Sequence, residues 1–303
     1  MSNSTGDGTT ETGQAPWRRQ GETEVETALH LVVLWASTPG RIGEVAALSR
    51  PAVLGRGPAQ NDDPAPRLRF SRQRPGANQP TPMLDPPRLS RVQLHVAPEH
   101  DHGLSFRRVG RCPVLLNGMP LDQGTAREGD VLTLTDALTL LVERRPKVMP
   151  DAWLADGYRD VPFGGPDPFG MVGESPYAWQ LRGQLAVLAQ GSDPILVTGA
   201  SGAGKELVAR ALHGLSARRA GSLVARNAAT LPSALIDAEL FGTQRGYPNP
   251  GAPERPGLVG EAAGGTLYLD EIGELPTDQQ AHLLRFLDGG EYHRLGEARA
   301  RTA

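Results

Sequence analysis

The chain has 303 residues, a formal net charge of −3 and a single cysteine, Cys112. One cysteine excludes an internal disulfide framework and suits a reducing compartment, and the charge excludes a general attraction to nucleic acid. No apolar run is long enough to span a membrane and the N-terminus lacks the apolar core of a signal peptide, so we expect a cytoplasmic protein without a membrane partner.

The amino-acid composition of the N-terminal half changes near residue 28. Residues 1–27 are mostly Ser, Thr, Gly, Gln and Glu, which predicts a disordered tail. Residues 28–146 contain short apolar runs separated by turn residues, which predicts an all-β sandwich. The predicted strands are 31–35, 42–47, 52–54, 68–70, 93–96, 104–107, 114–116, 131–134 and 138–142.

Residues 60–87 are rich in Pro, Asp and Arg, which predicts a long loop between two strands. Within it, Arg67, Arg69, Arg72 and Arg74 form a basic cluster. We expect these side chains to be solvated, and contact with an acidic or phosphorylated partner is the alternative.

Three dipeptides at predicted loops could form an anion site: Gly55-Arg56, Ser90-Arg91 and Asn117-Gly118. Arginine makes bidentate, charge-assisted bonds to phosphate, and a hydroxyl completes the shell. In this order the dipeptides resemble those of a forkhead-associated (FHA) domain, a β-sandwich that binds phosphothreonine peptides. The resemblance covers about 28–146 and implies a phosphothreonine-containing partner protein bound by Arg56, Ser90 and Arg91, with the Asn-Gly turn bracing the site.

This resemblance has two departures. Gln93 stands where the family often has histidine, and Cys112-Pro113 stands where an Asn-Gly pair normally helps to hold the peptide. The second departure argues against selectivity for threonine. A structural sandwich with no phosphopeptide role is therefore the alternative.

Residues 147–170 have little periodicity and much Pro, Gly and Asp, which predicts a linker. From residue 171 a strand–helix alternation predicts an α/β domain. Residues 195–198 read as a buried strand, and 199–205 match a phosphate-binding loop that leads into a helix. Its glycines let backbone N–H groups turn toward an anion at the helix N-terminus, and Lys205 can reach the β- and γ-phosphates. The predicted nucleotide-binding residues are Gly199, Ala200, Ser201, Gly202, Ala203, Gly204, Lys205 and Glu206.

Residues 264–271 read as an apolar strand that ends in two carboxylates, about 60 residues after the phosphate loop. Asp270 can hold Mg²⁺, partly through its water shell, and Glu271 can orient or deprotonate an attacking water. Glu206 follows Lys205 where a Ser or Thr usually ligates the metal, and by chemistry alone this weakens the site.

Three stretches resemble the AAA+ domain of sigma-54-dependent bacterial transcription activators: GASGAGKELVARALH, NAATLPSALIDAELFG and GGTLYLDEIGELPTDQQAHLLRFLDGGEYHRLG. The resemblance runs from about residue 171 to 303 and implies ATP and Mg²⁺ as cofactors and a homo-oligomeric ring. A Glu normally follows the Lys in that family, as Glu206 does, and 173–176 match residues at the domain entrance. The resemblance also implies that Asn227 restrains the catalytic Glu271 until ATP is sensed, with helix capping by Asn227 as the alternative.

Two departures from this family bear on function. Its sigma-54-contacting loop reads GAFTGA, whereas the aligned residues 246–251 read GYPNPG. Two prolines stiffen the loop and remove donors, which argues against contact with sigma-54 RNA polymerase. The family's arginine fingers, helical lid and DNA-binding domain have no counterpart here, so we expect an AAA+ domain that is incomplete at its C-terminus. Loss of the arginine fingers, worth about 10³–10⁵ in rate, argues against ATP hydrolysis.

Three functions follow from these patterns. The first is an ATP-binding transcription regulator of the sigma-54 activator type, with an FHA domain that senses phosphothreonine signals. The alternative is a non-enzymatic phosphopeptide-binding adaptor with a vestigial ATPase domain. A small-molecule phosphotransferase is disfavoured because neither an acceptor-substrate motif nor a lid is visible.

Overall fold

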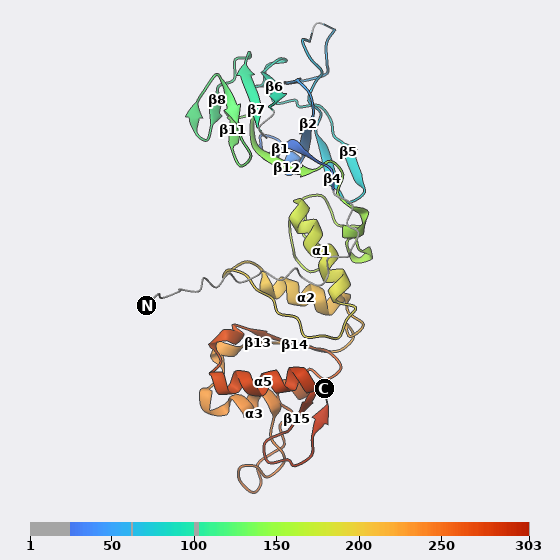
Figure 1. The fold of residues 1–303 in the computed structure, drawn as a ribbon, viewed down its shortest axis with the longest axis vertical. Helices are drawn as coiled ribbons and strands as arrows, with labels where there is room; N and C mark the ends of the chain where they lie inside the picture. Colours follow the sequence, from blue (N-terminus) through green and yellow to red (C-terminus); the bar gives the residue numbers. More distant parts are fainter. Residues whose placement is uncertain (1–24, 62, 100–102, 303) are drawn as a thin grey trace, which may run out of the picture. The chain divides into compact units, whose positions relative to one another are not determined.

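The computed structural model describes residues 25–61, 63–99 and 103–302, and it divides them into two units (Figure 1). The first unit contains the described residues up to Gln73 together with Ala77–Pro150. The second contains Arg74–Gly76 and the described residues from Asp151 onward. Most of the predicted tail lies outside the described residues, and the first strand begins at Thr27.

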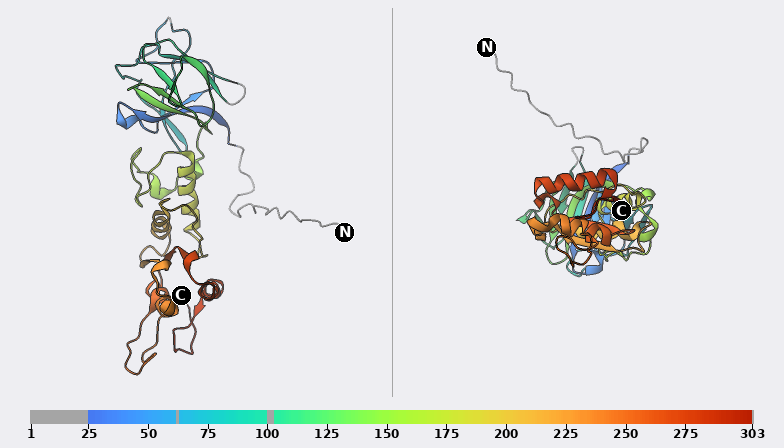
Figure 2. Two further views of the ribbon diagram at one scale, coloured as in Figure 1. Left: turned by 90° about the vertical axis from the view of Figure 1, so that its left-hand side faces the viewer. Right: turned by 90° about the horizontal axis from the view of Figure 1, so that it is seen from below.

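The first unit is a β-sandwich, which confirms the predicted fold class (Figure 2). One sheet has the strand order β5-β4-β2-β1-β12-β11-β8-β9, and the other has β10-β7-β6-β3. The strands are β1 Thr27–Ala36, β2 Val45–Leu48, β3 Ala52–Leu54, β4 Ser71–Arg74, β5 Ala77–Pro80, β6 Leu94–Pro98, β7 Leu104–Arg108, β8 Val114–Leu116, β9 Met119–Pro120, β10 Gln123–Ala126, β11 Val131–Leu134 and β12 Leu138–Pro146.

Alternating apolar residues from both sheets fill one core between them. In β6 and β7, Leu94, Val96, Leu104 and Phe106 point inward and are buried. Such alternation is what the sequence pattern detected, and the predicted strands 52–54, 114–116 and 131–134 agree with β3, β8 and β11 residue for residue.

His30 in β1 is buried and gives this unit a predicted dependence on pH. Burial lowers its pKa, and its Nδ1 lies 2.9 Å from the carbonyl oxygen of Ala28. The unfolded chain therefore takes up a proton at a higher pH than the folded chain does, so this contribution to stability is present above the unfolded pKa of 6.5 and is lost as pH falls below it.

We expect the urea midpoint of the first unit to fall between pH 7.5 and about pH 5.5. In the variant His30→Gln, which cannot titrate, this part of the fall should disappear. His293→Gln, a change at an exposed histidine of the second unit, is the control. An equal fall in wild type and His30→Gln would contradict the prediction.

The predictions of a long loop at 60–87 and of a strand at 68–70 are wrong. The segment contains the hairpin β4–β5, whose polar sequence shows no apolar alternation, and β4 begins at Ser71. Gly76 has φ +75° at the turn, a backbone conformation that glycine adopts without steric cost.

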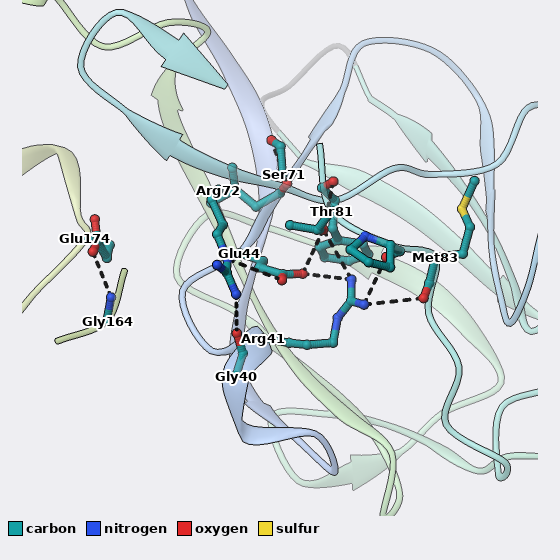
Figure 3. Close-up of polar contacts among 12 residues, drawn as sticks. Gly40, Arg41, Glu44, Ser71, Arg72, Thr81, Met83, Gly164 and Glu174 are labelled. Carbon is teal, nitrogen blue, oxygen red and sulfur yellow. Dashed lines mark hydrogen bonds and ion pairs between the residues drawn. The ribbon is translucent and has the colours of Figure 1, made fainter. Parts of the chain in front are cut away.

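A buried polar network holds this segment against the neighbouring loop (Figure 3). The carboxylate of Glu44 pairs with Arg41 at 2.7 Å and accepts a hydrogen bond from Thr81 Oγ1 at 3.0 Å. Arg41 also donates to the carbonyl oxygen of Pro82, and Arg72 donates to that of Gly40, at 2.9 and 3.1 Å. Arg72 is thus a structural contact rather than a freely solvated cation, which corrects the expectation for this member of the basic cluster.

The second unit is an α/β fold around the parallel strands β13 and β14, as predicted. Helix α2 lies on one side of this pair and α3 and α5 lie on the other (Figure 1). Its elements are α1 Pro176–Leu188, α2 Lys205–Leu215, β13 Leu223–Asn227, α3 Ile236–Phe241, α4 Gly257–Glu261, β14 Thr266–Asp270, α5 Thr277–Gly289, β15 Glu291–Tyr292 and β16 Arg301–Thr302.

The apolar residues of this unit gather between β13–β14 and the helices α3, α4 and α5. Phe241, Phe286 and Tyr292 form a cluster with ring centroids 6.0–6.2 Å apart. None of the helices in the described part of the chain has the length and apolarity needed to cross a membrane.

Two predictions for this half of the chain differ from the structure. Residues 195–198 form no strand, and Leu196 is 77% exposed, because this segment makes no ladder with β13 or β14. The stretch predicted as a linker, 147–170, contains two 3-10 helices, and its side chains Tyr158 and Asp167 are buried. Long-range contacts to α1, invisible in the local pattern, order this stretch.

Candidate functional site

The predicted phosphate loop lies directly before α2, which begins at Lys205. Gly202 and Gly204 have φ +75° and +87°, so the loop uses the conformations that its glycines permit. The ammonium of Lys205 donates to the carbonyl oxygens of Gly199 and Ala200, both at 3.2 Å. The loop therefore curls around an exposed cation at a helix N-terminus, where the first N–H groups have no acceptor within the helix.

The parallel register of β13 and β14 places Asn227 opposite Asp270. The side-chain amide of Asn227 donates to Glu271 Oε2 at 2.8 Å, and its oxygen accepts from the backbone N–H of Ala229 at 2.8 Å. Asn227 thus makes both contacts that the sequence left as alternatives, the contact with Glu271 and the cap of a 3-10 helix. The restraining role itself stays a prediction.

Glu271 follows β14 in a left-handed conformation, with φ 52° and ψ 40°. This conformation is uncommon for a residue with a side chain and costs about 1–3 kcal/mol. The backbone N–H of Glu271 donates to Asp270 Oδ1 at 3.0 Å and so ties the Asp270 carboxylate to the end of the strand.

One face of β14 is turned toward α2. His213 near the end of α2 lies 2.9 Å from Thr266 Oγ1 at the start of β14. Because side chains two and four residues along a strand share a face, Tyr268 and Asp270 point the same way as Thr266. Four residues of strand span about 13 Å and the eight residues from His213 back to Lys205 span about 12 Å, so Asp270 lies near the level of Lys205.

Tyr268 lies on this face between Thr266 and Asp270. Its hydroxyl oxygen is shielded from solvent. Burial, together with the nearby carboxylates of Asp270 and Glu206, raises the pKa of Tyr268 to about 12. Tyr268 was not among the predicted site residues, and a tyrosine within an apolar strand reads as part of the core.

A magnesium ion suits these donors. Within the described ranges, no cluster of three or more His, Cys, Asp or Glu side chains could enclose a metal ion. Magnesium in nucleotide sites keeps several waters and binds through one or two carboxylates and the phosphates, so Asp270 alone at the strand end fits that mode.

The structure brings together two of the three loop dipeptides of the sandwich. The backbone N–H of Arg56 donates to the carbonyl oxygen of Ser90 at 3.0 Å, and the Arg56 side chain is exposed. Ser90 Oγ accepts from the backbone N–H of Arg111 at 3.0 Å, so its own O–H can donate elsewhere. Arg91 is also exposed, and its carbonyl oxygen accepts from the guanidinium of Arg67.

Gln93 holds together the loops that carry Ser90 and Cys112. From the sequence it was identified only as a replacement of the family's histidine. Its side chain is buried, and Oε1 lies 3.3 Å from the backbone N–H groups of Ser90 and Cys112. Its Nε2 donates to the carbonyl oxygen of Cys112 at 2.8 Å. A Cβ at Gly110 would lie 2.3 Å from this Oε1, so glycine is required there.

Arg67 supports the loop at Arg91, whereas Asn117 holds the turn after β8 to the start of β11. Arg67 is buried and forms a two-point ion pair with Asp63, at 2.7 and 3.0 Å, which corrects the expectation that Arg67 is solvated. A hydrogen bond from Gln60 N and the pairing with Arg67 lower the pKa of Asp63. Asn117, in a left-handed turn, donates to Asp130 at 2.7 Å.

Comparison with known proteins identifies the C-terminal region. A family model described as the sigma-54 interaction domain matches residues 171–303. Residues 171–303 are a sigma-54 interaction domain.

Relatives of known role share this domain. The nitric oxide reductase transcription regulator NorR1 of Cupriavidus necator is 46% identical over 148 residues, 49% of this chain and 29% of that protein. The regulator NtrC of Rhizobium meliloti is 45% identical over 130 residues, 43% of this chain and 27% of that protein. The chain thus spans less than a third of the length of these relatives.

Solved structures match each half of the chain separately. NtrX from Brucella abortus in complex with ADP is 39% identical and covers 45% of this chain and 30% of its own, with a TM-score of 0.40. The FHA domain of the CT664 protein from Chlamydia trachomatis is 18% identical, covers 38% of this chain and 96% of its own, and has a TM-score of 0.27.

The residues at the entrance of the sigma-54 interaction domain have structural partners. Ser175 Oγ accepts from the backbone N–H of Ala178 at 3.2 Å and so caps α1. Glu174 accepts from the indole N–H of Trp179 at 3.0 Å and from the backbone N–H of Gly164 at 2.8 Å (Figure 3). Both side chains therefore fix the segment that leads into α1.

The loop at 246–251 of the sigma-54 interaction domain closes on itself. The backbone N–H of Gly246 donates to the carbonyl oxygen of Ala252 at 2.8 Å, and that of Ala252 donates to Asn249 at 3.0 Å. Tyr247 packs next to Gly296 and is 38% exposed, so the aromatic residue of this loop does not project fully into solvent.

Proposed function

We propose that this chain is an ATP-binding transcription regulator of the sigma-54 activator type whose sandwich unit senses phosphothreonine signals in the cytoplasm. The observation that carries the proposal is the contact of Asn227 with Glu271 at 2.8 Å, beside Asp270. This contact joins the ends of β13 and β14, where a nucleotide hydrolase needs one carboxylate that holds magnesium and a second that orients the attacking water.

Each residue of the nucleotide site has a distinct part in the proposed chemistry. Gly199, Ala200, Ser201, Gly202, Ala203, Gly204 and Glu206 supply the loop and the helix start that hold the phosphates, and the ammonium of Lys205 leaves its loop carbonyls for the β- and γ-phosphates. Magnesium, when bound, neutralises phosphate charge, and Asp270 holds it partly through water. Glu271 orients the attacking water, and Asn227 keeps Glu271 turned away until the γ-phosphate is present.

The structures of the relative NtrX with ADP and with ATP support a nucleotide as the ligand of this fold. In a homo-oligomeric ring, arginine fingers act on the nucleotide of the neighbouring subunit, and no residues of this sequence match them. The activity proposed for this chain is therefore nucleotide binding rather than hydrolysis. Sigma-54 RNA polymerase is the proposed partner of the second unit, although the prolines at 248 and 250 make the loop stiffer than the family pattern.

Nucleotide binding tests this proposal. We expect Lys205→Ala to weaken binding of ADP with Mg²⁺ at least tenfold, because the variant loses a charge-assisted hydrogen bond to phosphate. Lys147→Ala is a matched control, since Lys147 is the only other lysine in the sequence and belongs to the first unit.

Isothermal titration calorimetry on the three proteins measures the affinities. Equal affinity of wild type and Lys205→Ala would contradict the proposal. Absence of binding by folded wild type would leave the adaptor function in its place.

A further inference from the structure

We propose that Tyr268 is a positioning residue of the magnesium–nucleotide site, whose hydroxyl donates a hydrogen bond to the Asp270 carboxylate when the nucleotide complex binds. The inference rests on the proposed function, and it assigns a role to a residue outside the phosphate loop and the two strand-end acids.

The strand geometry directs Tyr268 to this site. Thr266, Tyr268 and Asp270 share one face of β14, and the contact of Thr266 with His213 shows that this face is turned toward α2. Opposite Tyr268 on β13 lies Ala225, which has a small side chain. Leu267 and Leu269 flank Tyr268 along β14 and lie on the opposite face of the strand, where they pack into the core with residues of α3 and α5.

The hydroxyl of Tyr268 is a buried polar group whose hydrogen bonding is incomplete. Its oxygen is shielded from solvent and makes no well-formed hydrogen bond to any described residue. Buried polar groups in folded proteins are nearly always hydrogen-bonded, so an exception beside a proposed ligand site calls for an explanation. Two carboxylates lie near this hydroxyl, those of Asp270 and Glu206, and that of Asp270 is within reach of a hydrogen bond from it.

The chemistry of Asp270 explains what the hydroxyl would do. Asp270 Oδ1 already accepts from the backbone N–H of Glu271 at 3.0 Å. A second donor would fix the plane of the carboxylate and so aim its remaining lone pairs at the water shell of the metal. A neutral hydroxyl suits this task better than a cation, because it leaves the negative charge of Asp270 to attract Mg²⁺.

The test compares Tyr268→Phe, which keeps the ring and removes the hydroxyl, with wild type. The matched control is Tyr292→Phe, a change at a buried tyrosine in the cluster with Phe241 and Phe286. The affinity for ADP is measured by calorimetry with saturating Mg²⁺ and again with EDTA. We expect the affinity gain from Mg²⁺ to fall about threefold to tenfold in Tyr268→Phe, with the affinity in EDTA unchanged.

The outcomes separate this inference from the proposed function. An unchanged gain from Mg²⁺ in Tyr268→Phe overturns the inference and leaves the proposed function standing. Equal weakening with Mg²⁺ and with EDTA also overturns it, because that result marks a structural role. Failure of folded wild type to bind ADP in either condition overturns both. The gain is a ratio within one variant, so partial destabilisation of Tyr268→Phe does not obscure it.

Discussion

Replacing Asp167 with alanine is expected to lower the free energy of unfolding of the second unit by about 3–5 kcal/mol. Asp167 pairs with Arg182 at 2.9 Å, and their side chains are 0% and 2% exposed. Asp167 Oδ1 also accepts from the backbone N–H groups of Phe169 and Met171, both at 2.9 Å. The variant would leave a buried guanidinium and two N–H groups without their acceptor.

Arg182 makes this pair the centre of the segment before the phosphate loop. Its guanidinium donates to the carbonyl oxygens of Gly173 and Met171, at 2.8 and 3.0 Å, and lies 4.8 Å from the ring centroid of Trp179. Loss of Asp167 therefore loosens the residues that enter the sigma-54 interaction domain.

Urea denaturation followed by tryptophan fluorescence checks this prediction, since Trp153 and Trp179 lie in the second unit. Asp156→Ala is the matched control, because the pair of Asp156 with Arg159 is largely exposed and should contribute little. A change as small for Asp167→Ala as for Asp156→Ala would show that the buried pair does not hold this segment.

The sandwich illustrates which strands a sequence can reveal. Strands β3, β8 and β11 are short, mostly apolar runs that pack against one core, so their bounds could be predicted. The hairpin β4–β5 has no such apolar run, and its segment is held through Thr81, whose partners Glu44 and Arg41 lie 37 and 40 residues earlier in the sequence. Such a network arises only when the chain is folded.

The second unit shows the same division between local and long-range information. The phosphate-loop pattern predicted the start of α2 at Lys205, because glycine conformations and helix initiation are local. The apolar run at 195–198 predicted a strand, but a strand exists only with a neighbour to pair with, and β13 and β14 pair with each other.

The two sites differ in how much of each was predictable. The pair of carboxylates at a strand end led to Glu271 and a family resemblance led to Asn227, and the structure places the two side chains in contact. The sequence did not predict Gln93 and Tyr268 as site residues, because their roles depend on the residues that surround them in the folded chain. A glutamine before a strand or a tyrosine within one has no local sequence signature. A buried polar atom at a predicted loop or strand end is the signal that finds such residues.

Arg56→Ala is expected to weaken binding of phosphothreonine peptides to the first unit about 10–100-fold, which corresponds to the loss of charge-assisted bonds to phosphate. The Arg56 side chain is exposed, and its backbone is tied to Ser90 at 3.0 Å, so the guanidinium and the Ser90 hydroxyl start from neighbouring points. Gln93 fixes the loop beneath them and should keep this spacing in the absence of ligand. Such preorganisation reduces the entropy lost on binding.

Fluorescence anisotropy with a labelled library of phosphothreonine peptides of randomised flanks measures this effect. Arg107→Ala is the matched control, because Arg107 is an exposed arginine on the outer face of β7 whose guanidinium contacts His95. The same library without phosphate should bind neither protein, and a phosphoserine library tests whether the replacement of the family's asparagine by Cys112 has cost selectivity for threonine. If Arg56→Ala bound the phosphothreonine library as tightly as Arg107→Ala does, these loops would form a structural end of the sandwich and the signal would have to enter elsewhere.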